Sequence, residues 1–242
     1  MNARGATDGP PRGRVAPRGA AARGRFGGIT LAAIVLAALS SVATAVPPTR
    51  EELAQWCGEA EDMAHCGRLI EQQQMERLPG LARREGVDLR IALFPSGSAT
   101  FSDVENPLQP LSYSLFDSIN AINAVLLFKT DGKKTTFVLL QRAGNRSVEL
   151  PSEPALSPDR QRLATADFCA TRCVNELAVW RVTRDGIRKE LTWTPRASWS
   201  DAVASWKTPE TVIVEYTAAG SQNRSRVERR LDDPSWVRAT SP

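Results

Sequence analysis

The chain has 242 residues and a formal net charge of +4 at pH 7. The first 25 residues hold six arginines and one aspartate, a charge of +5 that leaves about −1 for the rest. A near-neutral remainder gives no electrostatic case for binding nucleic acid or an anionic membrane surface. The length of this remainder suits one domain of ordinary size.

Residues 1–45 have the organisation of a secretory signal peptide. A basic segment rich in Gly and Pro, 1–25, precedes an uncharged apolar stretch, 29–39, and a run of small residues that ends at Ala45. This order of a basic region, a short apolar run and a small-residue ending is typical of cleaved export signals. We therefore expect cleavage between Ala45 and Val46 and a mature protein in the periplasm or the medium.

An uncleaved anchor is the alternative interpretation of the same region. Residues 26–46 carry no charge and approach the length that a bilayer requires. Gly, Ser and Thr interrupt this stretch, so its strongly apolar part is shorter than a membrane span. We therefore expect the protein to associate with the membrane only if this N-terminal segment stays uncleaved.

All four cysteines, Cys57, Cys66, Cys169 and Cys173, follow the expected cleavage site. An even number of cysteines in an oxidising compartment indicates disulfides, and we favour the two local pairs. Cys169 and Cys173 can face each other across a hairpin tip. Cys57 and Cys66 would lie about 13 Å apart along one continuous helix, so their pairing requires a helix break. Four buried free thiols are the alternative, since the spacings match neither usual zinc sites nor C-x-x-C redox sites.

We expect a short helical cap over residues 46–86. Thr49 and Glu52 form the pattern of a capping box, which predicts a helix from there to about Cys57. Apolar spacing predicts a second helix over 62–78, which Pro79-Gly80 would end.

The remainder, 87–242, has the pattern of an antiparallel β domain. Asp131-Gly132 and Asp185-Gly186 each separate two apolar runs and predict hairpins, whereas 102–112 reads as a loop. The fold class is therefore mainly β: an antiparallel meander or sandwich, or a blade-like partial propeller, beneath the helical cap. The predicted strands cover 87–94, 121–129, 135–141, 147–150, 162–168, 174–183, 187–194, 211–217 and 225–231.

The cysteine hairpin makes a prediction about register. A three-residue loop between Cys169 and Cys173 would join strands 162–168 and 174–183 directly. One face of the second strand would then hold Leu177, Val179 and Arg181, and the other Ala178, Trp180 and Val182.

A short repeat carries a resemblance to a known family. Residues 155–159 read Ala-Leu-Ser-Pro-Asp, and 204–210 read Ala-Ser-Trp-Lys-Thr-Pro-Glu, each before a strand-like run. The first copy resembles the Ser-Pro-Asp-Gly strand repeat of periplasmic Tol-type β-propellers, and the other copy is similar to it in a degenerate form. The resemblance covers about residues 153–231, and Arg160 stands where the family has Gly. It implies blade-like sheets in which the Asp holds a tight turn, and it implies no function.

Few residues point to catalysis. The one histidine, His65, sits among charged residues on the second predicted helix, where an exposed position is the simplest interpretation. A metal site built from histidines is thereby excluded, and no nucleophile elbow or phosphate-binding glycine motif occurs. Thr130 and Lys133 have a nucleophile-x-x-Lys spacing but straddle a predicted turn. We therefore expect no cofactor, no metal and no enzymatic activity.

Carboxylates and tryptophans remain as candidates. A hydrolase would need two carboxylates across a cleft, one with a raised pKa, and seven are scattered through the β region: Asp117, Glu153, Asp159, Asp167, Asp201, Glu210 and Glu215. The tryptophans of the last third would form either a ligand platform or, as we favour, core packing between sheets: Trp180, Trp193, Trp199, Trp206 and Trp236.

Three functions follow as hypotheses. The leading one is an exported, non-catalytic β-domain that binds a protein or another envelope component. A carboxylate-based envelope hydrolase and an accessory structural protein without a discrete ligand are the alternatives. An exposed apolar patch or groove would favour a binding role over a purely structural one.

Overall fold

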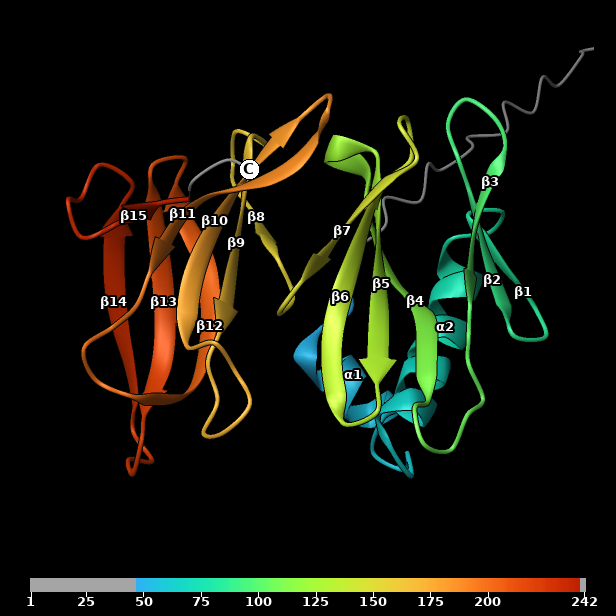
Figure 1. Ribbon diagram of the computed structural model, residues 1–242, viewed down its shortest axis with the longest axis horizontal. Coiled ribbons are helices and arrows are strands. Elements are labelled where there is room, and N and C mark those ends of the chain that lie inside the picture. The colour runs from blue at the N-terminus through green and yellow to red at the C-terminus, as the bar shows by residue number, and fades with distance from the viewer. Residues whose placement is uncertain (1–46, 240–242) are drawn as a thin grey trace, which may run out of the picture. The chain divides into compact units, whose positions relative to one another are not determined.

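The computed structural model describes residues 47–239, which form two helices and four antiparallel sheets (Figure 1). The protein is mainly β, as the sequence predicts. The signal peptide over 1–45, with its segments 1–25 and 29–39, lies outside the described residues. The same holds for the Ala45–Val46 cleavage site, for the alternative anchor over 26–46 and for the last three residues of the β domain.

The helical cap begins with the capping box that the sequence predicts. The Thr49 hydroxyl accepts a hydrogen bond from the Glu52 N–H at 3.2 Å, and the Glu52 carboxylate accepts one from the Thr49 N–H at 2.8 Å. Helix α1 (Arg50–Trp56) is followed by a break and by α2 (Met63–Arg77), which starts at the N-cap Asp62. The break brings the Cα atoms of Cys57 and Cys66 to 4.7 Å, and the two residues form a disulfide.

Fifteen strands form the sheets, which we call A to D. Sheet A contains β1 (Ala82–Glu85), β2 (Asp88–Ala92) and β3 (Ser98–Ser102). Sheet B is a meander of β4 (Leu111–Ile119), β5 (Ala124–Asp131), β6 (Lys134–Gln141) and β7 (Arg146–Leu150), with a 3-10 turn (Asn120–Ile122) after β4. Sheet C contains β8 (Ala155–Leu156), β9 (Arg162–Asp167), β10 (Glu176–Thr183), β11 (Gly186–Trp193) and β15 (Val237–Arg238). Sheet D contains β12 (Trp199–Thr208), β13 (Thr211–Ala218) and β14 (Arg224–Arg230).

The sheets pack face to face in chain order, so sheets B and C are each covered on both faces. In β5, Val125 and Leu127 pack toward sheet A, while Leu126 and Phe128 pack toward sheet C and the cap. In β10, Leu177 and Val179 join the core with sheet D, and Trp180 joins the core with sheet B. The alternation of side chains along a strand produces both assignments, and it confirms the predicted faces of β10.

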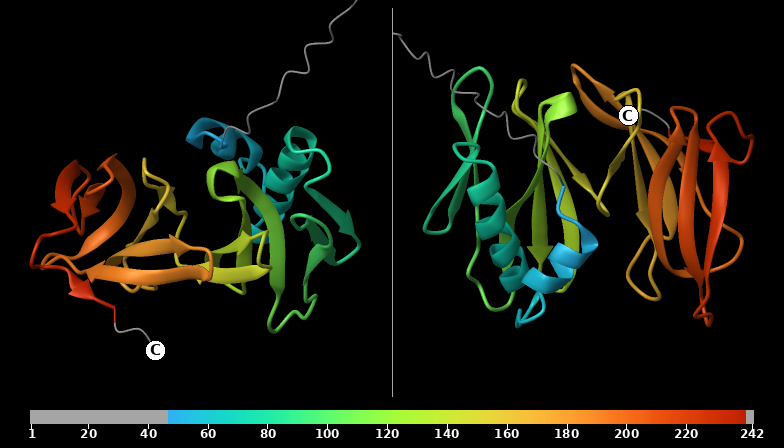
Figure 2. Two further views of the ribbon diagram at one scale, coloured as in Figure 1. Left: turned by 90° about the horizontal axis from the view of Figure 1, so that it is seen from above. Right: turned by 180° about the vertical axis from the view of Figure 1, so that it is seen from behind.

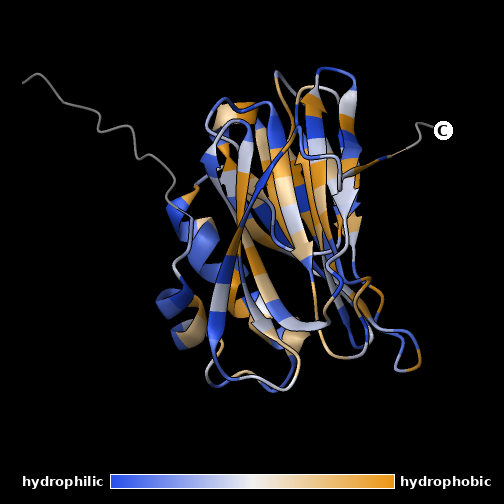
Figure 3. Cartoon of the chain, turned by 90° about the vertical axis from the view of Figure 1, so that its left-hand side faces the viewer, coloured by the Kyte–Doolittle hydropathy of each residue, from blue (hydrophilic) through white to orange (hydrophobic). Residues whose placement is uncertain are grey.

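Helix α2 lies across one face of sheet B (Figure 2). Gly67 allows the close approach, because a Cβ atom there would lie 2.9 Å from Ser114 Oγ and 3.0 Å from Phe128 Cδ1. The outer surface of the helices is largely hydrophilic, whereas the strands carry alternating hydrophobic bands (Figure 3).

Several predicted boundaries are wrong. The helical cap does not extend to residue 86, because β1 already occupies Ala82–Glu85. Strand β4 begins at Leu111, inside the expected 102–112 loop, and continues through a stretch without a prediction. Strand β12 was also missed. In β4 the polar residues Ser114 and Asp117 are buried, so its pattern does not show the apolar alternation of an ordinary strand.

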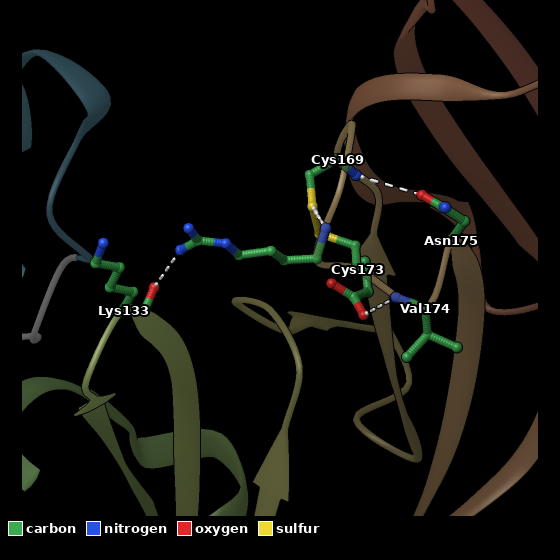
Figure 4. Close-up of a disulfide and its surroundings, with 7 residues drawn as sticks. Lys133, Cys169, Cys173, Val174 and Asn175 are labelled. Atoms are coloured by element: carbon green, nitrogen blue, oxygen red, sulfur yellow. Dashed lines mark hydrogen bonds between the residues drawn. A yellow bond between two sulfur atoms is a disulfide. The ribbon is translucent and has the colours of Figure 1, made fainter. Parts of the chain in front are cut away.

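The loop between β9 and β10 differs most from expectation. Asp167 pairs with Glu176 in the ladder, so the loop has eight residues rather than three. Cys169 and Cys173 do form a disulfide, with Cα atoms 5.4 Å apart, but they lie inside the loop (Figure 4). The backbone leaves the strand because Asn175 adopts a φ of +59°, which few residues other than Gly adopt.

Side chains hold this loop in place. The Asp167 carboxylate accepts a hydrogen bond from the Val174 N–H at 2.9 Å, and the Asn175 side-chain oxygen accepts one from the Cys169 N–H at 3.4 Å. Arg172 reaches across to sheet B and donates to the Lys133 carbonyl at 3.4 Å (Figure 4). The disulfide loop thereby links sheet C to the β5–β6 hairpin.

Within residues 47–239, no helix combines the length and the apolar character needed to cross a membrane.

Candidate functional site

An apolar groove lies between the helical cap and sheet B. We call it the cap groove; its volume is about 500 Å³. Three phenylalanine rings from β4, β5 and β6 pack edge to face at its base, with centroids 5.0 Å apart for Phe116–Phe137 and 5.6 Å for Phe128–Phe137. The remaining apolar lining comes from the two helices and their connection: Leu53, Ala54, Cys57, Ala60, Met63, Cys66 and Ile70.

A second hollow of about 290 Å³, the side pocket, adjoins the cap groove. Leu53 and Glu153 line both hollows, so the two meet on either side of these residues. Arg50 and Ser152 add polar groups to the side pocket. Its other walls come from small residues of sheets C and D: Ala155, Ala166, Ala202 and Ala204.

Helix α1 forms a loosely held wall of both hollows. It buries none of its seven residues, and so short a helix has little stability of its own in water. The Cys57–Cys66 disulfide ties its end to α2. Arg77 adds an ion pair with Glu52 at 2.5 Å and lies over the Trp56 ring, 4.8 Å from its centroid. Helix α1 is thus held by the disulfide after its last residue, by the Glu52–Arg77 ion pair, and by Leu53 and Trp56, which pack on the core without being fully buried.

One carboxylate, Glu153, lines both hollows, and a second, Asp117, is buried near it. Glu153 is exposed to solvent although protein surrounds it on several sides, as expected of a residue in a concave site. This crowding raises the pKa of Glu153, and the nearby Asp117 carboxylate raises it further, while Arg50 lowers it. Among the described residues, no Lys, Arg or His nitrogen lies within 4.0 Å of the Glu153 carboxylate.

Asp117 is the more deeply buried of the two carboxylates, with 6% of its surface exposed. A bulge in β4 places it opposite Leu126, a residue of the sheet face that carries the cap groove. Burial raises the pKa of Asp117 to about 6, against the opposing effect of the Ser118 N–H. Its Oδ1 atom has no hydrogen-bond partner. A buried polar atom without a partner is costly and often marks a functional position.

A separate polar cluster covers the edge of β4. The Glu71 carboxylate bonds the Arg84 guanidinium at 2.7 and 2.9 Å and accepts the Leu115 N–H at 3.1 Å. Arg68 and Arg84 both donate to the Tyr113 carbonyl. Burial raises the pKa of Glu71 to about 7, opposed by Arg68 and by the Leu115 N–H.

Asp103 completes this cluster by accepting the Tyr113 N–H at 2.9 Å and pairing with Arg68 and Arg84. These side chains satisfy the backbone groups that an edge strand leaves unpaired. We therefore assign the cluster a structural role. The sequence did not reveal it, since Glu71 and Gln74 occupy positions on the buried face of α2 that are ordinarily apolar.

A wider cleft of about 730 Å³ lies beside the start of α2 and contains His65. The His65 N–H donates to Asp62 at 2.8 Å, and its Nδ1 accepts the Glu61 N–H at 3.3 Å, so it takes part in capping the helix. His65 is exposed, as expected. Thr130 and Lys133 also line this cleft. Thr130 shares a 2.6 Å hydrogen bond with Ser112, and Lys133 lies in the β5–β6 turn as predicted.

Of the seven carboxylates, the structure brings Asp117 and Glu153 together beside the hollows. Asp159 closes the Ser-Pro-Asp turn through Ser157 at 2.6 Å and the Gln161 N–H at 3.1 Å. Asp167 holds the disulfide loop. The others lie on sheet D, where Asp201 and Glu215 each approach Arg224 at 3.7 Å and Glu210 is exposed.

No protein-family model and no curated protein matches the chain. The resemblance to Tol-type propellers therefore stays a prediction.

The tryptophans of the last third are core residues. Trp180, Trp193, Trp199 and Trp236 each expose 8% or less of their surface, which excludes them as an open platform. Trp206 is half-buried and donates from its ring N–H to the Ala155 carbonyl at 2.8 Å. The residues that form the cap groove were not foreseen as a group, because the groove depends on how the helices dock on sheet B.

Within residues 47–239, no cluster of three or more His, Cys, Asp or Glu side chains is arranged to hold a metal ion.

Proposed function

We propose that the mature protein is a non-catalytic binding module of the cell envelope that holds an apolar group of a partner in the cap groove. The main support for this proposal is the groove itself. It is open, it has a volume typical of ligand sites, and it is lined almost wholly by apolar side chains. The exposed Met63 at its rim supports this role, because methionine adapts its shape to a bound partner. A purely structural accessory protein would have no need of such a groove.

The location in the envelope is part of the same proposal. Two disulfides and the absence of a membrane-spanning helix among the described residues are compatible with an extracellular or periplasmic protein. We propose export through the N-terminal signal, with Val46 as the first residue of the mature chain. Mass spectrometry of protein from the exporting cell tests this, because intact residues 1–45 on membrane-bound protein would establish the anchor.

A groove-filling substitution tests the binding function. Ala54 is exposed on α1 and lines the groove, so Ala54→Trp should occupy part of the space without disturbing the core. Ala219→Trp, in the exposed β13–β14 turn, is the matched control. A specific partner should co-purify from envelope extract with the wild type and the control but not with Ala54→Trp. Equal recovery with all three proteins would place the binding site elsewhere.

An envelope hydrolase is the second candidate, and the proximity of Asp117 and Glu153 favours it. One exposed and one buried carboxylate with raised pKa values could serve as acid and base. The burial of Asp117 ranks this function lower, because Asp117 lines neither hollow and a substrate bound there would not reach it. Hydrolysis of sugar or peptide substrates that Asp117→Asn and Glu153→Gln both abolish would reverse the ranking.

A further inference from the structure

The charges around the cap groove are of one sign. Its lining includes two acidic residues, Asp62 and Glu153, and no Lys or Arg. Asp62 is already engaged as the helix cap, whereas Glu153 is open to solvent and has no ion pair among the described residues. Glu190, by contrast, is neutralised by two basic partners, Arg162 and Arg181. The accessible end of this apolar groove therefore carries an unneutralised negative charge.

A second observation at the same place points to a ligand. Asp117 exposes only 6% of its surface, its Oδ1 lacks a hydrogen-bond donor, and its charge acts directly on Glu153. Ser152 Oγ, beside Glu153 in the side pocket, is also buried without a partner. Arg50 also lines the side pocket and its charge acts on Glu153, but the two side chains form no ion pair within 4.0 Å. The Ser152 hydroxyl is therefore free to exchange a hydrogen bond with a ligand in the side pocket, whereas Asp117, which lines neither hollow, acts on such a ligand only through its charge.

We infer that the occupant of the cap groove is a cationic side chain, Lys or Arg, flanked by apolar residues in a partner protein. The inference rests on the proposed function and specifies its ligand. Apolar neighbours would pack on the accessible part of the lining, Ala54 and Met63, above the buried phenylalanine rings, and the ammonium or guanidinium group would pair with Glu153. A hydrogen bond to an ionised, partly desolvated acceptor is stronger than one between neutral groups, so the charge should add selectivity to the apolar contact.

Three probes of equal chain length separate the apolar contribution from the charge. We would titrate octylammonium, octanol and octanoate, each below its aggregation concentration, into the 15N-labelled mature protein and follow amide shifts. Octylammonium should bind at least tenfold more tightly than octanol, and octanoate most weakly. Glu153→Gln should remove this preference while octanol binding stays unchanged. Asp201→Asn, an exposed acid on sheet D, is the matched control and should behave as the wild type.

The pH dependence of binding is a further test, because a Glu153 with only a structural role would not make octylammonium affinity depend on pH. Octylammonium affinity should fall as the pH is lowered from 7.5 to 5, because Asp117 takes up a proton as the pH falls through about 6 and the raised pKa of Glu153 also favours its neutral form, and octanol affinity should not change. A pair of peptides tests the source of the cation: acetyl-Phe-Lys-Phe-amide should bind more tightly than acetyl-Phe-Met-Phe-amide.

Each outcome has a distinct meaning. Octanol binding as tightly as octylammonium would overturn the charge inference and leave the groove as an apolar site. No shift at groove residues with any probe would contradict the proposed function itself. Binding of octylammonium without binding of the lysine peptide would overturn the assignment to a partner protein and indicate a small organic cation.

Discussion

At the scale of single residues, Arg160 shows how the Ser-Pro-Asp turn is built. Its φ is +60°, the left-handed region that glycine adopts without penalty and that costs other residues about 1 kcal/mol. Ser157 and Asp159 hold the turn despite this cost, since Ser157 Oγ also accepts the Arg162 N–H at 2.9 Å. Arg160, which stands where the Tol-type repeat has Gly, therefore has a strained backbone conformation.

Replacing this residue should stabilise the protein. Arg160→Gly should raise the free energy of unfolding by about 0.5–1 kcal/mol, because the relief of strain exceeds the entropy that glycine adds to the unfolded chain. Urea denaturation measures the change. Gln161→Gly, at the next position and without a positive φ, should instead destabilise. Destabilisation by both would show that the Arg160 side chain contributes more than its backbone costs.

Asp117 should make stability depend on pH. Its pKa is about 6 in the folded protein against 3.8 for the ordinary group. Between these values the folded protein keeps a proton that the unfolded chain has lost. The group therefore contributes stability at low pH that is lost as the pH rises through about 6, at most about 3 kcal/mol.

Asp117→Asn should remove this loss. The variant should be more stable than the wild type by about 1–3 kcal/mol at pH 7.5 and similar to it at pH 4, as measured by urea unfolding at both values. Asp201→Asn, an exposed acid, should show little change at either pH. If the effect of Asp117→Asn were the same at pH 4 and pH 7.5, burial would not control the ionisation of this carboxylate.

At the scale of elements, the sequence predicted what depends on local pattern. The capping box of α1, the helix break between Cys57 and Cys66, and the β5–β6 and β10–β11 hairpins all have local signals, and all occur. Strand β4 lacks a sequence signal because polar residues, Ser114 and Asp117, occupy buried positions in it. The β9–β10 loop is longer than the sequence predicts because the strand pairing ends at Asp167 and Glu176, outside the two cysteines. The left-handed φ of Asn175 and the hydrogen bond from the Val174 N–H to Asp167 hold the chain between them away from the strands.

The edge cluster on β4 should be important for stability. Arg84→Met leaves Glu71 and Asp103 without a main partner and the Tyr113 carbonyl with one fewer donor, so it should destabilise by about 3 kcal/mol or more. Arg83→Met is the matched control, since Arg83 is a neighbour on β1 whose side chain is 65% exposed and pairs only with Glu85. Chemical denaturation measures both. Similar small losses would show that the cluster is replaceable.

The two disulfides should differ in how much they stabilise the protein and in which element they hold in place. Replacing Cys169 and Cys173 by Ser should cost about 1–2 kcal/mol and a few degrees of melting temperature, because the loop is short and the strand ladder sets the register. Replacing Cys57 and Cys66 by Ser should cost about 2–3 kcal/mol and speed amide exchange in α1, which buries no residue. Hydrogen-exchange mass spectrometry distinguishes them. Unchanged exchange in α1 would mean that the Glu52–Arg77 pair suffices to hold it.

At the scale of the whole molecule, the stacking of the sheets explains why the central strands could be predicted from the sequence and why the position of the acidic residues could not. Because sheets B and C are covered on both faces, their central strands are continuously apolar and easy to predict. Asp117 on β4 and Glu153 in the β7–β8 connection lie near each other although they are 36 positions apart in the sequence. Their proximity depends on how the cap, sheet B and sheet C meet, which no local pattern specifies.

The most direct test of the cap groove as the binding site is site-specific photo-crosslinking in the exporting cell. A photoreactive residue at position 54 lies in the groove, and one at position 219 lies in the β13–β14 turn. We predict a discrete crosslinked partner from position 54 that is absent from position 219 and weakened by Glu153→Gln. No adduct from position 54, or the same adduct from both positions, would contradict the account.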